Sequence, residues 1–305
     1  MKRDFLAITD FKKDEILEIL EMTKELKKIR KNGKDYKPLK GKSMAMIFQK
    51  PSARTRVSFE TGMHQLGGHA VYLSPSDIQI GKREAVSDIA RVLSRYNDVI
   101  MARLFGHEDI LELAEFAAVP VVNGLTDLLH PCQVMSDVFT IIEKKGSLEK
   151  LKIAYIGDGN NVANSWLNMA SRLPMNLVFG IPEGYEPDKE IFSAAKKARI
   201  SQIELYHNPK MAAKNADVIY TDVWTSMGQE KEQELRREIF KEYQIDDDMV
   251  KLADDDVIVM HCLPAHRGEE IVDSVIDGPH SVVYDQAENR LHAQKAILLK
   301  LLGTE

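Results

Sequence analysis

The stretch Gln49-Lys50-Pro51-Ser52-Ala53-Arg54-Thr55-Arg56-Val57-Ser58-Phe59-Glu60 joins two segments whose patterns decide the fold. Before it, residues 43–48 (SMAMIF) form an apolar run of strand length. After it, apolar residues recur at helical spacing until Gly67-Gly68 ends the pattern. A strand, a turn and a helix therefore follow one another, and Ser52 falls where a helix N-cap is expected.

The first turn of this expected helix carries Arg54, Thr55 and Arg56. Cations oppose the helix dipole at this end, which favours anions. An anion bound among the free N–H groups would reverse that argument, with both guanidinium groups as further donors. Arginines that simply point into solvent are the ordinary alternative. The conjunction of apolar strand, capping Ser52 and an Arg-Thr-Arg helix start nevertheless indicates a phosphate site.

The composition of the 305-residue chain, 44% hydrophobic and 29% charged, is typical of a soluble globular protein with room for two domains. The net charge of −6 argues against nucleic acid or an anionic membrane as a partner. No apolar run approaches membrane-spanning length, and the N-terminal residues lack the apolar core of a signal peptide. Cys132 and Cys262 are too few for a disulfide scaffold or a cysteine-built metal site. We therefore expect a cytoplasmic protein.

Strand and helix patterns alternate in two series, which predicts an α/β fold of two doubly wound domains, each with a central parallel sheet flanked by helices. The expected strands are 43–48, 70–73, 98–102 and 119–122, then 152–156, 176–180, 202–206, 217–221 and 256–260. The expected helices include 14–30, 85–96, 110–118, 131–145, 230–242, 246–253 and 289–302, and 74–83 is expected to be a loop. We place the domain boundary near Gly146, giving domains at 1–146 and 147–288.

Ligands of open parallel sheets bind beyond the carboxyl ends of the strands. In the first domain these ends carry the Ser52 to Arg56 turn, Arg103, and His130 with Gln133. Such cationic and hydrogen-bonding groups suit a dianion with an adjacent carbonyl. In the second domain the ends carry polar residues that suit a small zwitterion, with a carboxylate for an ammonium group and an amide for a carboxylate. These residues are Asn161, Asp222, Ser226, Met227 and Cys262.

Each of these residues also has an ordinary interpretation. His130 could only cap the helix that begins at Pro131, and Cys262 after an apolar strand is usually a small core residue. Nothing places a base beside Cys262, so a hydrolase-type triad has no support. The acidic runs 246–248 and 254–256 could bind a divalent cation, but helix capping explains them better, and we expect no metal.

The segment Gly157-Asp158-Gly159-Asn160-Asn161-Val162 follows an expected strand and opens a helix, as a dinucleotide-binding fingerprint does. The third glycine of that fingerprint is replaced by Val162, whose branched side chain would obstruct the helix–strand approach. A nicotinamide-dependent oxidoreductase is therefore the weaker hypothesis. A non-catalytic binder of phosphate or amino acids is a third.

With these residues in view, the chain resembles the aspartate/ornithine carbamoyltransferase family nearly from end to end. Ser52-Ala53-Arg54-Thr55-Arg56 is similar to the family's carbamoyl-phosphate motif, and His130-Pro131-Cys132-Gln133 to its second shared motif. Ala53 is often threonine or leucine in relatives, and its side chain has no assigned role. The segments 222–228 (DVWTSMG) and 261–264 (HCLP) resemble the ornithine branch, as does Asn161.

The resemblance implies a cofactor-free transfer from carbamoyl phosphate to L-ornithine, giving L-citrulline and phosphate. It implies that the phosphate is held by Ser52, Arg54, Thr55 and Arg103. The carbamoyl oxygen would be polarised by Thr55, Arg103 and His130, and the carbamoyl amide oriented by Gln133 and the Cys262 and Leu263 carbonyls. Arg290 would also reach the carbamoyl phosphate. The α-amino and α-carboxyl groups of ornithine would be held by Asn161, Asp222, Ser226 and Met227.

The resemblance further implies interdomain helices, a C-terminal helix 289–305 that returns to the first domain, and a homotrimer or an assembly of trimers. Gln79 would enter the site of a neighbouring subunit. The setting would be amino-acid metabolism, in arginine biosynthesis, the urea cycle or arginine breakdown. The near rival is a carbamoyltransferase that acts on aspartate or putrescine. Aspartate would require a cation where Asp222 stands, and putrescine has no carboxylate for Asn161 to bind.

Overall fold

The computed structural model describes residues 2–225 and 230–303, which form two compact units. Unit 1 comprises residues 1–139 and 289–305, and unit 2 comprises residues 140–288. The chain passes between the units inside α6 (Pro131–Lys145) and again inside α13 (Val283–Leu302). None of the described helices is both long enough and apolar enough to cross a lipid bilayer.

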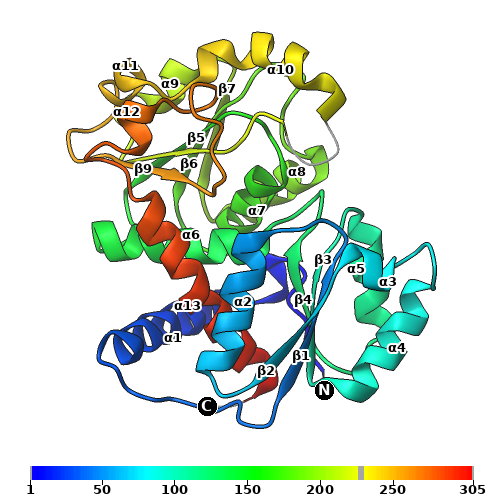
Figure 1. The fold of residues 1–305 in the computed structure, drawn as a ribbon. Helices are drawn as coiled ribbons and strands as arrows, with labels where there is room; N and C mark the ends of the chain where they lie inside the picture. Colours follow the sequence, from blue (N-terminus) through cyan, green and yellow to red (C-terminus); the bar gives the residue numbers. More distant parts are fainter. Residues whose placement is uncertain (1, 226–229, 304–305) are drawn as a thin grey trace. The chain divides into compact units, whose positions relative to one another are not determined.

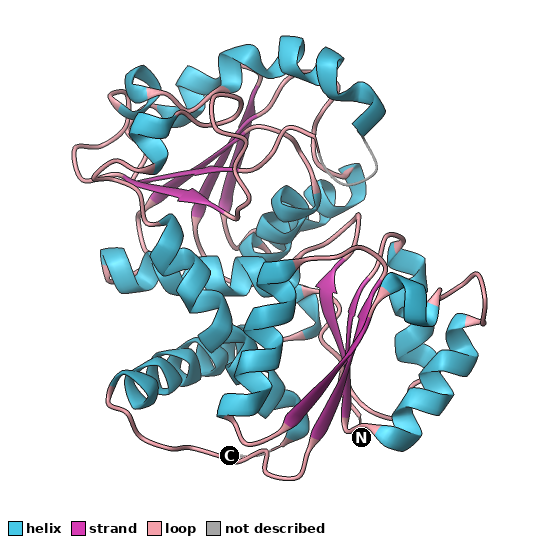
Figure 2. Ribbon diagram, in the orientation of Figure 1, coloured by secondary structure: helices cyan, strands magenta, loops and turns pink. Residues whose placement is uncertain are grey.

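Unit 1 is built on a parallel sheet with the strand order β2-β1-β3-β4. Its strands are β1 (Ser43–Phe48), β2 (His69–Leu73), β3 (Val99–Arg103) and β4 (Val121–Leu125). Its other elements are η1 (Ile8–Asp10), α1 (Lys13–Lys31), α2 (Ala53–Gln65), α3 (Pro75–Ile78), α4 (Val86–Tyr96) and α5 (His107–Phe116). Helices cover both faces of the sheet, as Figures 1 and 2 show.

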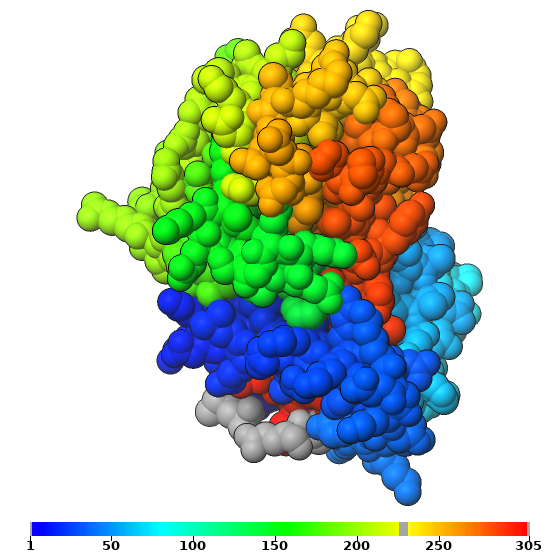
Figure 3. All heavy atoms as spheres, turned by 90° about the vertical axis from the view of Figure 1, so that its left-hand side faces the viewer, coloured from blue at the N-terminus to red at the C-terminus, as the bar shows by residue number. Residues whose placement is uncertain are grey.

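The two faces of this sheet explain why its strands β1 and β3 read as mostly apolar runs. On one face, Ala45 and Ile47 of β1 pack in a core with Ile89 of α4 and Leu113 of α5. Helix α2 lies over the other face (Figure 1). A strand buried on both sides needs apolar residues at every position, not at alternate ones. The charged side of α1 faces solvent, and the dark blue surface in Figure 3 belongs to the N-terminal part of the chain.

Unit 2 contains a second parallel sheet, with the order β7-β6-β5-β8-β9. Its strands are β5 (Lys152–Ile156), β6 (Asn176–Gly180), β7 (Gln202–Tyr206), β8 (Val218–Thr221) and β9 (Ile258–His261). Its other elements are α7 (Asn161–Ala170), α8 (Lys189–Ala198), α9 (Pro209–Ala213), η2 (Glu230–Glu232), α10 (Gln233–Phe240), η3 (Lys241–Tyr243), α11 (Asp247–Val250) and α12 (Asp273–Ile276). On one face of the sheet, Tyr155 and Tyr220 stack at 5.5 Å between ring centroids, and Trp166 of α7 meets Tyr220 edge-on.

The predicted two-sheet α/β fold is confirmed, with differences at several element ends. The segment expected to be a loop at 74–83 contains α3. The side chain of Asp77 stabilises the N-terminus of this helix by accepting a hydrogen bond from the Ser74 N–H at 2.8 Å. Strand β4 lies later than 119–122 because it includes Asn123 and Gly124, residue types that are depleted in strands and hide the pattern. The expected helix 230–242 is divided into η2, α10 and η3.

The last helix begins earlier than predicted. Helix α13 starts at Val283, not at residue 289, because no proline or glycine interrupts 283–288. The prediction for the first acidic run is confirmed: Asp246 caps α11 by accepting a hydrogen bond from the Met249 N–H at 2.8 Å.

Candidate active site

The start of α2 carries the expected cap. Ser52 Oγ accepts a hydrogen bond from the Thr55 N–H at 3.4 Å and lies 3.2 Å from Thr55 Oγ1. Arg290 Nη2, from α13, donates to the same Thr55 hydroxyl at 3.2 Å. Thr55 is buried, whereas Ala53 and Arg54 are exposed at the very start of the helix. A guanidinium group therefore joins the N–H groups at a helix end where an anion is stabilised.

Arg56 makes contacts other than those expected if both arginines of the turn serve an anion. Its Nε lies 3.1 Å from Glu60 Oε2, four residues further along α2. Its guanidinium also lies over the Tyr72 ring, 3.9 Å from the centroid. These two contacts direct Arg56 along the helix and towards β2.

Arg103 and Arg290 bring positive charge to the carboxyl edge of the unit 1 sheet, close to His130. Arg103 ends β3, where it pairs with Phe48 of β1 and Leu125 of β4. Burial lowers the pKa of His130 well below its usual value, and the positive charges of Arg290 and Arg103 lower it further. His130 is therefore a neutral imidazole beside two guanidinium groups. A neutral ring can donate one N–H to an oxygen without adding a third charge.

The pKa of His130 predicts a specific pH dependence of stability. Below the ordinary pKa of about 6.5 the unfolded chain takes up a proton at this residue that the folded chain does not. The His130 contribution therefore destabilises the fold as pH falls below about 6.5, by about 1.4 kcal/mol per pH unit until the folded pKa is reached. Urea unfolding at about pH 7.5 and 5.5 should show a smaller loss for His130→Gln than for the wild type. Equal losses in the two proteins would contradict this assignment.

Gln133 lies in the first turn of α6 and is 1% exposed. Its Nε2 donates to Asp137 Oδ1 at 2.8 Å, which fixes the orientation of the amide. Within the described residues, no hydrogen bond reaches its buried Oε1. A buried amide oxygen held in this way is suited to accept an N–H from a ligand. Sequence reasoning identified Gln133 but missed Asp137, which stands one helical turn later.

Gln79 and Cys132, two further residues considered in the sequence, have well-defined positions. Gln79 is the left-handed C-cap of α3, with φ of 43°, and it is exposed. Cys132 is fully buried and donates to the Asn123 carbonyl at 3.3 Å. Burial raises the pKa of its thiol to about 12, so Cys132 is not a nucleophile.

In unit 2, Asp222 is the centre of a hydrogen-bonded cluster. The residue follows β8, is 6% exposed and accepts three hydrogen bonds from residues that the structure describes. Asn160 Nδ2 donates to Oδ2 at 2.8 Å, and the Val223 N–H and Cys262 Sγ each donate to Oδ1 at 2.8 Å. The register of β8 and β9 pairs Thr221 with His261, which places Asp222 beside Cys262. Asn160 was not predicted as a partner of Asp222.

The Gly157 to Val162 turn is shaped by packing within unit 2. Asn160 caps α7 by accepting a hydrogen bond from the Val162 N–H at 2.9 Å, and the largely buried Asn161 is the first residue of that helix. A Cβ added to Gly159 would lie 2.4 Å from backbone atoms of Glu186 and Pro187. Close approach of the 185–187 segment therefore explains this glycine without a dinucleotide.

The backbone after Asp222 is held by a buried ion pair. Arg236 Nη1 lies 3.1 Å from Asp158 Oδ1 and donates to the Trp224 carbonyl at 2.9 Å. Burial raises the pKa of Asp158 to about 6, although Arg236 opposes the shift. Ser226 and Met227, which were predicted to contact the amino acid, lie outside the described residues.

The ligand atoms of Asp222, His261 and Cys262 lie within 4.8 Å of one another, as metal ligands would. Both ring nitrogens of His261 are already engaged. Nε2 lies 2.9 Å from Glu270 Oε1, and Nδ1 accepts the Leu263 N–H at 2.8 Å. A metal ion at this position would have to displace one of these bonds.

Comparisons with known proteins agree along the whole chain. The family model described as "Aspartate/ornithine carbamoyltransferase, carbamoyl-P binding domain" matches residues 3–143, and the one described as "Aspartate/ornithine carbamoyltransferase, Asp/Orn binding domain" matches residues 149–301. A protein of Syntrophus aciditrophicus named ornithine carbamoyltransferase is 57% identical over 298 residues, which cover 98% of this chain and 99% of that protein. A Pyrococcus furiosus protein named "Ornithine carbamoyltransferase, anabolic" is 54% identical over 304 residues, 99% of this chain and 96% of its own.

Solved structures give the same result. The ornithine carbamoyltransferase of Pyrococcus furiosus superposes with a TM-score of 0.95 at 52% identity, covering 100% of this chain and 98% of that one. The enzyme of the same name from Thermus thermophilus superposes with a TM-score of 0.90 at 42% identity, covering 99% of both chains.

Proposed function

This chain belongs to the aspartate/ornithine carbamoyltransferase family, and we propose that it transfers the carbamoyl group of carbamoyl phosphate to the δ-amine of L-ornithine, giving L-citrulline and phosphate. The observation that carries the choice of ornithine is identity above 50%, along nearly the whole chain, to relatives named ornithine carbamoyltransferase. Carbamoyl phosphate is an activated acyl donor, so the transfer as proposed needs no cofactor.

Carbamoyl phosphate is assigned to unit 1, which consists of residues 1–139 and 289–305 and is close to the predicted domain of residues 1–146 with 289–305. The phosphate is proposed to bind at the N-terminus of α2, which consists of Ser52, Ala53, Arg54 and Thr55. The guanidinium group of Arg290 donates to Thr55 Oγ1, which supports placing Arg290 beside the phosphate as well. Arg103 supplies a further positive charge at the same sheet edge.

Attack on the carbamoyl carbon builds negative charge on the carbamoyl oxygen. Thr55, Arg103 and the neutral His130 are assigned as the donors that stabilise this charge, and one such donor is typically worth about 2.7–4 kcal/mol. Gln133 Oε1 is assigned to accept an N–H of the carbamoyl amide, because it is buried and Asp137 fixes its orientation. The backbone carbonyls of Cys262 and Leu263 are proposed to complete that contact.

Ornithine is assigned to residues 147–288. The carboxylate of Asp222 still has acceptor capacity for the α-ammonium group after its three hydrogen bonds. Asn161, Ser226 and Met227 are proposed to hold the α-carboxylate. Asp222 disfavours aspartate, because the side-chain carboxylate of that substrate would meet a like charge. Putrescine would leave the carboxylate-binding groups unpaired.

Citrulline formation tests the acceptor directly. The enzyme should form a ureido product from carbamoyl phosphate and L-ornithine, detected colorimetrically, and much less product from L-aspartate or putrescine at equal concentration. Aspartate or putrescine as the preferred acceptor would assign the chain to another branch of the family. If no product forms with ornithine, aspartate or putrescine, the remaining hypothesis is a non-catalytic binder of phosphate or amino acids. We expect the absorbance of added NADH to stay constant during the reaction, because a carbamoyltransferase does not oxidise it. A fall in absorbance would favour an oxidoreductase.

The attacking amine must be neutral, and deprotonating an alkyl ammonium of pKa about 10.4 at pH 7 costs about 4–5 kcal/mol. We assign Cys262 a place beside that amine, where its thiol, held by Asp222 at 2.8 Å, helps to select the neutral form. The departing phosphate is proposed to accept the proton.

The variant Cys262→Ser tests that role. We expect kcat to fall on the order of 10²-fold and the acidic limb of the pH–kcat profile to move, because a serine hydroxyl is a smaller and more strongly hydrogen-bonding group than the thiol. The KM for carbamoyl phosphate should change little. A rate and pH profile equal to those of the wild type would exclude Cys262 from the proton step.

For the assembly, we propose a homotrimer or a higher assembly of trimers, in which Gln79 reaches the site of a neighbouring subunit. The exposed position of Gln79 at the end of α3 is compatible with that contact. Sedimentation equilibrium should give a mass of three chains or a multiple of three, and a monomer would refute the proposal. The proposed compartment is the cytoplasm. The proposed process is arginine biosynthesis, supported by the relative named anabolic, with the urea cycle as another setting for the same reaction.

A further inference from the structure

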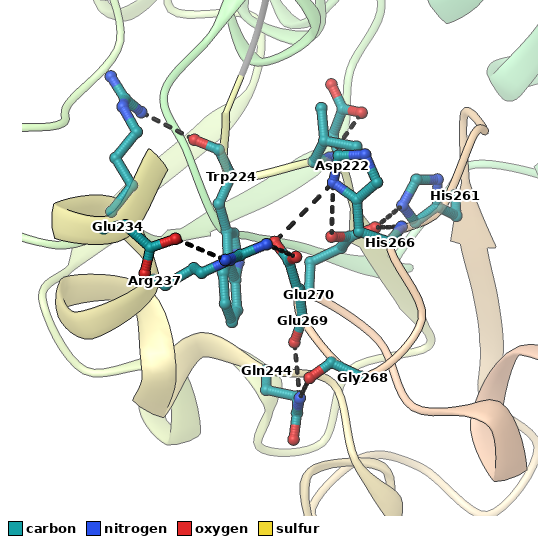
Figure 4. A network of polar contacts seen from close by, with 12 residues as sticks. Asp222, Trp224, Glu234, Arg237, Gln244, His261, His266, Gly268, Glu269 and Glu270 are labelled. Carbon is teal, nitrogen blue, oxygen red and sulfur yellow. Dashed lines mark hydrogen bonds and ion pairs between the residues drawn. The ribbon is translucent and has the colours of Figure 1, made fainter. Parts of the chain in front are cut away.

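A buried chain of hydrogen bonds runs behind the Cys262 turn, within unit 2. Glu270 and His261 have side chains that are 0% exposed, and Figure 4 shows them side by side. Glu270 Oε1 accepts hydrogen bonds from His261 Nε2 at 2.9 Å and from the His266 N–H at 2.6 Å. His261 Nδ1 accepts the Leu263 N–H at 2.8 Å.

This geometry determines the tautomer of His261. A backbone N–H can only donate, so Nδ1 must be the unprotonated nitrogen of the ring. The ring proton is then on Nε2, where Glu270 accepts it. The carboxylate thus holds the imidazole in the one neutral form that can receive the Leu263 N–H.

The Leu263 bond holds an uncommon backbone conformation. Leu263 has φ of 56°, in the left-handed region that branched side chains rarely adopt. A side-chain acceptor that binds the N–H two residues later is the geometry of an Asx turn, which asparagine and aspartate usually form. Here the imidazole of His261 takes the place of the asparagine oxygen.

We propose that Glu270 and His261 are positioning residues, which set the turn that presents the Leu263 carbonyl and the Cys262 thiol to the reactants. This inference rests on the proposed function of that turn. Neither residue touches the substrates in this account. Misplacement of a turn by about 1 Å can cost on the order of 10²-fold in rate, which gives the scale of the expected effects.

Two pairs of variants separate positioning from mere core packing. Glu270→Gln keeps the single oxygen that accepts both bonds, and His261→Asn keeps an acceptor for the Leu263 N–H. We expect each to retain kcat within about tenfold of the wild type. Glu270→Leu and His261→Phe preserve volume but remove the acceptors, and we expect each to lose about 10²-fold in kcat. Packing alone would predict the reverse order at residue 261, since asparagine leaves a cavity.

Glu269→Leu is the matched control for Glu270→Leu. Glu269 is adjacent in sequence, but its side chain is 23% exposed, and its carboxylate pairs with Arg237 at 2.6 Å and lies 3.9 Å from His266 Nδ1, without a bond to His261 (Figure 4). Its kcat should remain near that of the wild type. A His261→Phe variant as active as the wild type, or a His261→Asn variant as impaired as His261→Phe, would overturn the proposal.

Nitrogen NMR of ¹⁵N-histidine-labelled protein reads the tautomer without any assay of activity. The wild type should show a histidine with an unprotonated Nδ1 and a protonated Nε2 that is missing from the His261→Asn spectrum. A His261 signal with a protonated Nδ1 would refute the inference. Absence of citrulline formation by the wild type would instead refute the proposed function, so the two failures are distinguishable.

Discussion

Replacing Arg103 by glutamine is expected to lower kcat/KM for carbamoyl phosphate by about 10²–10³-fold, the usual cost of one donor to a developing oxyanion. Arg103 ends β3 at the sheet edge that also receives the start of α2, and its charge contributes to the lowered pKa of His130. Initial rates of citrulline formation at varied carbamoyl phosphate measure the effect.

Arg56→Gln is the matched control, because it makes the same change two residues after Arg54 in the turn proposed to bind the phosphate. Arg56 is engaged with Glu60 and with the Tyr72 ring, and exposed pairs of this kind contribute about 0–1 kcal/mol. Its kcat/KM should remain close to that of the wild type. Equal losses in the two variants would mean that general positive charge, not the position of Arg103, supports the reaction.

The second large effect is expected at Asp222. Asp222→Asn should raise the KM for ornithine by about 30-fold or more, because truncating one partner of a buried charge pair costs about 2–5 kcal/mol. The KM for carbamoyl phosphate should change little, since the proposed contacts of its phosphate group lie in unit 1 and no contact with it is assigned to Asp222. Steady-state kinetics with each substrate varied in turn separate the two constants.

Asp188→Asn provides the control for this change. Asp188 caps α8 by accepting the Glu190 and Ile191 N–H groups, and asparagine caps helices about as well as aspartate. Its KM values should be unchanged. An Asp222→Asn enzyme that keeps the ornithine KM of the wild type would contradict the assignment of the ammonium group to this carboxylate.

Much of the fold was predictable because the strands are short, apolar and separated by clear helical patterns. β1, β5 and β6 lie where the sequence predicts them, since burial on both faces leaves a mostly apolar run. The edge strand β7 also lies at its predicted position. The cap at Ser52 was predictable for a local reason, because its partner Thr55 lies three residues away. The bounds of β4 were not, because Asn123 and Gly124 hide the strand pattern. The start of α13 was not, because no proline or glycine separates residues 283–288 from the rest of the helix.

The contacts within the site were predictable only in part. Side chains at the ends of adjacent strands could be expected to converge, as Asp222 and Cys262 do. Which atoms meet depends on distances in space, so the Asn160 bond to Asp222 and the Arg290 bond to Thr55 were beyond sequence reasoning. The same holds for Glu270, because the neighbouring sequence does not indicate that its buried carboxylate accepts a hydrogen bond from His261.

The most direct test of the account is a crystal structure with phosphonoacetyl-ornithine, which joins mimics of the two substrates in one molecule. The account predicts that Arg54, Thr55 and Arg103 contact the phosphonate and that Asp222 contacts the α-ammonium group. Guanidinium groups of Arg54 and Arg103 turned away from the phosphonate would contradict it.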